Sequence, residues 1–218
     1  MLRDCDINEI SDGKKYTLTD MVKVTCDDCK GCSACCSGMG SSLVLDPLDV
    51  HRISVRLGKK FEELLEREIE LNIVDGVILP NIKMTPACTF LNEEGRCSIH
   101  TDRPGICRIF PLGRYYENDD FTYILQVNEC PASQKAKVKV SKWIDTPQLK
   151  ENQDFIRDWH YFLRDIHDKL AKSQDEQLMK QVTMRILQFF YMEPYTQERD
   201  FYEQFQERLS HAKKMYLG

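Results

Sequence analysis

The chain has 218 residues, of which 42% are hydrophobic and 30% are charged, and this composition excludes a disordered chain. The net charge is -5 with Lys and Arg scattered along the chain, so we expect no nucleic-acid partner. The first sixteen residues lack the apolar core of a signal peptide, and no segment has the apolar length of a membrane helix. We therefore expect a cytoplasmic protein with no membrane partner.

Ten cysteines lie at positions 5, 26, 29, 32, 35, 36, 88, 97, 107 and 130, and none follows. This change in composition predicts a cysteine-cluster metal-binding domain over residues 1–145 and a three-helix region over residues 146–218 that packs on it. In a reducing compartment clustered cysteines remain thiols, which favours metal binding or catalysis over a disulfide framework.

The first predicted element is the run CDDCKGCSACC at residues 26–36, in which Cys-x-x-Cys recurs three times before Cys36. Three thiolates at two-residue spacing are typical of [4Fe-4S] ligation with a fourth ligand from elsewhere, whereas zinc sites usually pair two separated knuckles. The spacing favours an iron–sulfur cluster over zinc. Because successive side chains diverge in strands and in helices, we do not expect Cys35 and Cys36 both to reach one metal.

The segment DPLDVHRISVRLG predicts a helix over residues 46–58, with Asp46 as its cap, Pro47 in its first turn and Gly58 as its stop. Leu48, Ile53 and Leu57 would share its buried face. Asp46 and Asp49 most simply cap this helix, and the alternative is an acid/base role near the metal.

A second helical stretch is predicted over residues 61–72. Asp75 and Gly76 then signal a hairpin turn, and Pro80 would end the strand that follows. Residues 86–131 are rich in loops, with a strand pair that turns at 118–120 and would bring Cys107 and Cys130 toward the same end.

From Thr146 onward the pattern predicts three helices, the first capped by Thr146, the second opened by Ser173 and the third starting at Thr196. Their apolar stripes, which include Phe162 and Phe205, are expected to form a core over the cysteine region. The fold class is therefore α+β, a small loop-rich metal domain with short antiparallel strands covered by C-terminal helices.

Several separated motifs together resemble the YkgJ-type cysteine-cluster family, described as zinc- or iron-chelating CxxCxxCC domains. They are CKGCSACC at 29–36, the following DPLDVHRI, CTFLNEEGRCSIH at 88–100 and RPGICRIFP at 103–111. The resemblance covers about residues 26–131. It implies as metal ligands Cys29, Cys32, Cys35, Cys36, Cys88, Cys97 and Cys107, with Cys130 as a further member and Cys5 and Cys26 as extras.

Arg103 and Arg108 flank Cys107 and could neutralise an anionic cluster or bind an acidic substrate, although structural ion pairs or carbonyl contacts are the simpler interpretation. His100 could ligate zinc, but with so many cysteines we expect it to lie outside the coordination shell.

We expect a metal-binding protein carrying an iron–sulfur cluster, or else zinc, with a role in redox chemistry, electron transfer or support of a modification reaction. A flagellin lysine N-methylase shares this kind of cysteine domain, so the resemblance also implies an S-adenosylmethionine-dependent methyltransferase as an alternative. A zinc-stapled module that binds a protein partner is the third hypothesis.

Overall fold

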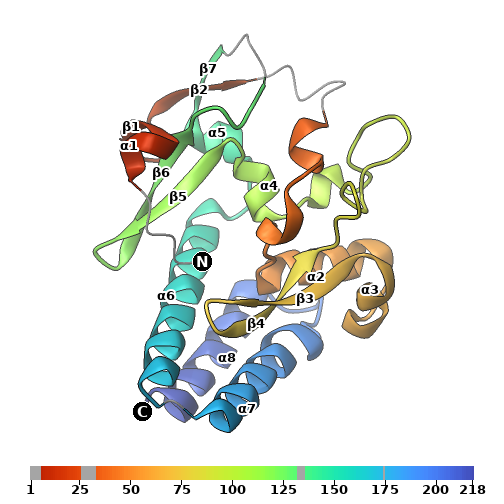
Figure 1. Cartoon of the computed structure of the whole chain (residues 1–218), viewed down its shortest axis with the longest axis vertical. Helices are drawn as coiled ribbons and strands as arrows, with labels where there is room; N and C mark the ends of the chain where they lie inside the picture. Colours follow the sequence, from red (N-terminus) through yellow and green to blue (C-terminus); the bar gives the residue numbers. More distant parts are fainter. Residues whose placement is uncertain (1–5, 26–32, 132–135, 174) are drawn as a thin grey trace.

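The computed structural model describes residues 6–25, 33–131, 136–173 and 175–218. Most of the short antiparallel strands lie toward one end of the molecule and the long helices toward the other, while the hairpin over residues 69–82 lies beside the helices (Figure 1). The predicted α+β class is confirmed. Within the described part of the chain, every helix is too short or too polar to cross a membrane.

The strands of the described residues form three small antiparallel sheets. One has the order β1-β6-β5, and the other two are the pairs β2-β7 and β3-β4. The predicted turn at 118–120 joins β5 to β6, with Asn118 and Asp119 at positive φ. The strand bounds are β1 (Ser11–Tyr16), β2 (Met21–Thr25), β3 (Ile69–Val74), β4 (Val77–Ile82), β5 (Leu112–Glu117), β6 (Asp120–Gln126) and β7 (Ala136–Lys139).

The helices divide into short ones among the strands and three long ones at the C-terminal end (Figure 1). The short α-helices are α1 (Ile7–Ile10), α2 (Pro47–Leu57), α3 (Phe61–Arg67), α4 (Gly105–Ile109) and α5 (Val140–Ile144). The long ones are α6 (Leu149–Ser173), α7 (Glu176–Leu187) and α8 (Phe201–Tyr216). Single turns of 3-10 helix are η2 (Ala34–Cys36), η3 (Gly40–Ser42) and η4 (His100–Asp102), and η5 (Gln188–Met192) is a π-helical turn.

The helix predicted over residues 46–58 is confirmed as α2. The Asp46 carboxylate accepts the Asp49 amide at 2.9 Å, and the Asp49 carboxylate accepts the Asp46 amide at 3.2 Å. This reciprocal cap satisfies two of the amides that a helix start leaves free. Gly58 ends the helix with a φ of 64°. The prediction that Leu57 lies on the buried face of this helix is wrong, because its side chain is 36% exposed.

The helix predicted over residues 61–72 is wrong in its second half. It ends at Arg67, and Ile69–Val74 form β3, which pairs with β4 around the predicted Asp75-Gly76 turn. The complete ladder with β4 outweighs the local helix pattern, as tertiary pairing often does. Pro80 does not end β4. Its carbonyl points away from β3 and accepts the Leu45 amide at 2.8 Å, so the ladder needs no N–H donor at this position.

Three C-terminal helices are confirmed, but each start differs from its prediction. Helix α6 begins at Leu149 rather than beside Thr146, because Gln148 has a positive φ of 50°. Asp175, not Ser173, caps α7 by accepting the Leu178 amide at 3.0 Å.

The start predicted at Thr196 for the last helix is also wrong. The Thr196 amide donates instead to the Gln204 side chain at 2.9 Å, which holds residues 196–200 as a loop folded onto α8. Asp200 then caps α8 by accepting the amides of Tyr202 and Glu203 at 2.8 and 3.1 Å. Asp is a preferred N-cap residue, whereas the Thr196 hydroxyl is bonded elsewhere.

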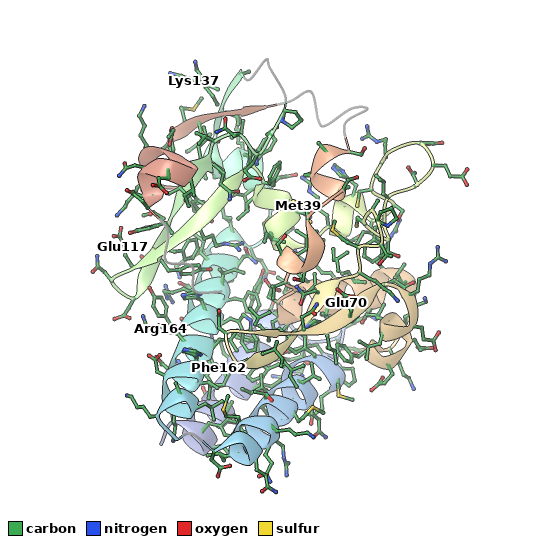
Figure 2. All side chains as sticks on the ribbon, viewed as in Figure 1. Met39, Glu70, Glu117, Lys137, Phe162 and Arg164 are labelled. Atoms are coloured by element: carbon green, nitrogen blue, oxygen red, sulfur yellow. The ribbon has the colours of Figure 1, made fainter. Side chains whose placement is uncertain are left out.

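The three long helices bury their aromatic stripes together. Phe162, labelled in Figure 2, is fully buried with Phe190 and Phe205. The same apolar cluster continues through Leu45 into the cysteine-bearing half. The buried Tyr191 hydroxyl donates to the Leu45 carbonyl at 3.0 Å and so links the helices to the segment that precedes α2.

Candidate metal centre

The last two cysteines of the N-terminal run lie in the 3-10 turn η2. The Cys36 amide donates to the Ser33 carbonyl at 2.9 Å and closes this turn. The Cys36 carbonyl then accepts the Cys88 amide at 2.8 Å, and Ser37 pairs with Ala87. Two cysteines about fifty residues apart in sequence thus become neighbours through a short antiparallel bridge.

Cys88 and Cys97 stand at the two ends of a small loop. Leu91 bridges to Cys97, and the Ser98 amide donates to the Phe90 carbonyl at 2.8 Å, which fixes the loop ends together. The amides of Phe90 and Leu91 donate to the Cys88 thiol, and the Ile99 amide donates to Cys97. Amides directed at sulfur are the hydrogen bonds that stabilise thiolates and tune thiolate-bound metals.

Cys107 lies on α4, which is anchored on both sides. The Gly105 amide donates to the Asp49 carboxylate at 2.8 Å, tying α4 to the start of α2. The Trp143 indole N–H donates to the Ile109 carbonyl at 3.0 Å, tying α4 to α5. These contacts hold the partly buried Cys107 against the apolar core.

The five thiols of Cys35, Cys36, Cys88, Cys97 and Cys107 all line one cavity of about 830 Å³. They come from three separate segments of the chain: η2, the loop over residues 88–97, and α4. Both vicinal cysteines face it, and the Cys35 thiol donates a hydrogen bond to the Cys36 sulfur. We expected these two side chains to point in different directions, but both lie in the 3-10 turn η2 and line the same cavity.

The pKa values of these thiols depend on burial and on one another. The hydrogen bond to Cys36, with burial next, raises the pKa of Cys35, and the same hydrogen bond lowers the pKa of Cys36. Burial raises the pKa values of Cys88, Cys97 and Cys107, although the amides donating to Cys88 and Cys97 oppose that rise. A thiophilic cation would reverse this balance, because metal coordination deprotonates a thiol.

The remaining predicted ligands are placed differently. Cys29 and Cys32 lie outside the described residues, as do Cys5 and Cys26. Cys130 is half-buried and is not among the residues that line the cavity, although its neighbour Glu129 is. Among the described residues, no three His, Cys, Asp or Glu side chains form a preassembled metal site. The thiols share a cavity wall without forming a finished coordination shell.

The two arginines that flank Cys107 have structural partners. Arg108 is buried, and its guanidinium donates to the carbonyls of Thr101 and Asp145 at 2.6 and 3.0 Å. Arg103 contacts the His100 ring at 2.7 Å. Its positive charge also acts to lower the pKa values of Cys35 and Cys97. The carbonyl contacts favour the simpler interpretation for Arg108, whereas Arg103 retains an electrostatic influence on the thiols.

Polar side chains line the same cavity, and two of them, Arg114 and Tyr116, were not predicted from the sequence. Asp46 and Asp49 of α2 line it together with Arg114 and Tyr116 of β5. Burial, and then the neighbouring Asp49 carboxylate, raise the pKa of Asp46. Arg114 and Tyr116 carry no motif, because their strand shows only ordinary alternation. Only the antiparallel pairing of β5 with β6 brings them to this position.

The chemistry of the thiol wall fits zinc or an iron–sulfur cluster. Thiolate is a good ligand for both, whereas calcium and magnesium require oxygen donors. Five thiols on one wall are more than a single tetrahedral site uses. The amides that donate to Cys88 and Cys97 would offset negative charge on coordinated sulfur.

Comparison with known proteins agrees with this donor set. No curated protein and no solved structure matches the chain. A family model described as "Putative zinc- or iron-chelating domain" matches residues 28–139, about half of the chain. The matched range includes all five thiols that line the cavity. The chain therefore belongs to the CxxCxxCC family of metal-chelating domains.

Proposed function

We propose that this protein holds an iron–sulfur cluster through thiolates that converge from the N-terminal run, the 88–97 loop and α4. The observation that carries the proposal is the gathering of five thiols from these three segments on one cavity wall. Cys29 and Cys32 complete the proposed ligand set, because their spacing to Cys35 is typical of cluster ligation.

Zinc is the competing occupant, since the same thiolates suit it. Iron–sulfur is favoured by the triple Cys-x-x-Cys spacing and by the number of thiols. A bound cluster would supply one-electron redox chemistry, which corresponds to a role in electron transfer, redox sensing or a supported modification reaction. The helical region over residues 146–218 covers this centre, because Ile156, Trp159 and His160 of α6 line the same cavity.

Anaerobic purification followed by metal and sulfide analysis tests the proposal. We expect iron and acid-labile sulfide in a fixed ratio, with broad visible absorption that bleaches on reduction. Colourless protein with stoichiometric zinc would show that zinc, not a cluster, is the occupant, and would leave the proposed thiolate site standing. Protein that takes up neither metal, even when reconstituted under reducing conditions, would contradict the thiolate site itself.

A further inference from the structure

The cavity is larger than the thiol wall requires. Its volume of about 830 Å³ lies within the range of small-molecule sites, roughly 300 to 1,000 Å³. Beyond the thiols it extends between α2, β5 and α6, where both charged and aromatic side chains line it. This space has room for an organic ligand beside the metal centre.

Two opposite charges face this space without pairing with each other. Arg114 bonds to the Tyr123 hydroxyl, and among the described residues it forms no ion pair. Its Nε atom is buried and has no hydrogen-bond partner. Of the Asp46 carboxylate, one oxygen accepts the Asp49 amide, and no described side chain donates to the other.

These two groups lie close to one point of the backbone. A methyl group placed on Gly105 would be 3.5 Å from Nη2 of Arg114, 3.8 Å from Oδ1 of Asp49, which accepts the Gly105 amide, and 4.0 Å from Oδ2 of Asp46. Both side chains are partly buried where they line the cavity, and a charged group in such a place is stabilised when a partner of opposite charge reaches it. Burial raises the pKa of Asp46, and an approaching cation would lower it again and so favour the ionised carboxylate.

Aromatic side chains also line the cavity. The rings of Tyr116 and His160 stack with their centroids 3.5 Å apart and their planes at 7°. Trp159 of α6 lines the same cavity. Such surfaces hold the apolar part of a small molecule, while a few polar groups fix its orientation.

We propose that the cavity binds an α-amino acid or a molecule with the same zwitterionic head group, whose carboxylate pairs with Arg114 and whose ammonium pairs with Asp46. The inference extends the proposed function, because the ligand would lie beside the metal centre. Its recognition groups are not the proposed metal ligands, so ligand binding and metal binding can fail separately.

Calorimetry on the metal-loaded full chain tests this proposal with each standard L-amino acid except cysteine and histidine, which bind metals through their side chains. We expect saturable binding by at least one of them. Its N-acetyl derivative, which lacks the ammonium, and its amide, which lacks the carboxylate, should each bind about tenfold or more weakly, as expected when a charged hydrogen bond is lost.

Two variants locate the binding. Asp46→Asn keeps the helix cap, since Asn is an equally good N-cap residue, and Arg114→Gln removes the cation. Both should weaken binding by a similar factor at unchanged metal content, whereas Arg157→Gln, outside the cavity, should bind as the wild type does. Absence of binding by every amino acid would overturn the proposal. Binding that survives both variants would also overturn it, because the ligand would then sit on the metal.

Discussion

Residues 33–42 and 84–109 are held by single turns, short bridges and hydrogen bonds to side chains, whereas residues 149–216 bury aromatic rings in long helices. The first two segments carry all five thiols that line the cavity. Residues 149–216 supply Phe162, Phe190 and Phe205 to the core. The comparison indicates that the helices can be stable by packing alone, while the cysteine-bearing loops depend on what the thiols bind.

Replacing thiols that line the cavity should have the largest effect. Cys88→Ser and Cys107→Ser each remove a proposed ligand from a different segment, and serine is a poor ligand for soft metals. We expect loss of most of the bound metal and a clear fall in melting temperature, measured by elemental analysis and thermal unfolding. Cys130→Ser is the matched control and should keep its metal, because Cys130 does not line the cavity. Full metal content in both cavity variants would refute the proposed ligand set.

Truncating a ring in the helical core should reduce stability without touching the metal. Phe205 is fully buried against Phe155, with ring centroids 4.6 Å apart. Phe205→Ala should cost about 3 to 5 kcal/mol in the free energy of unfolding, measured by denaturant titration. The exposed Met184→Ala should change it by less than about 0.5 kcal/mol. Loss of metal from the folded Phe205→Ala protein would show that the two regions are not energetically separate.

A substitution at Arg108 tests whether this side chain stabilises the protein through its two carbonyl contacts or only through its charge. Arg108→Lys keeps the charge but cannot reach both the Thr101 and Asp145 carbonyls. We expect a loss of about 2 kcal/mol in the free energy of unfolding, the scale of a hydrogen bond from a charged group. Arg157→Lys, whose ion pairs with Asp154 and Asp158 are partly exposed on the surface of α6, should lose less than about 0.5 kcal/mol. Equal effects in the two variants would argue against a structural role for Arg108.

The smallest expected effect is a change in how stability depends on pH. Because burial and Asp49 raise the pKa of Asp46, the folded protein keeps a proton that the unfolded chain releases above its ordinary carboxyl pKa. Folding is thus favoured at low pH, and this contribution declines as the pH rises through the folded-state pKa. Asp49, Arg52 and Arg114 act on the same carboxyl.

Asp46→Asn does not titrate, so its unfolding free energy should fall less steeply with increasing pH than that of the wild type. Denaturant titrations across the pH range measure this difference. The thiols titrate in both proteins and therefore do not enter it. Parallel curves for the two proteins would show that Asp46 has an ordinary pKa.

Local signals in the sequence were reliable where a single side chain decides the structure. Asp46 and Gly58 bound α2 as predicted, and the Asp75-Gly76 turn lies where expected. The predictions were wrong where pairing between strands decides the structure. Residues 69–72 have a helical pattern but complete a ladder with β4, and Pro80 is tolerated because its carbonyl faces Leu45.

The cysteine motifs could be found from spacing, but their arrangement on one cavity could not. Cys36 and Cys88 become neighbours through a backbone bridge that neither motif encodes. The polar residues that β5 adds to the cavity were even harder to predict from the sequence. Arg114 and Tyr116 belong to an ordinary strand, and only the sheet and α6 turn them toward Asp46.

X-ray absorption spectroscopy at the bound metal of the anaerobically purified protein tests the central claim most directly. The account predicts a first shell made of sulfur alone, with a second iron shell if the occupant is a cluster. In Cys88→Ser, the metal that remains should show fewer sulfur neighbours. A first shell dominated by nitrogen or oxygen in the wild type would contradict the claim that these thiolates hold the metal.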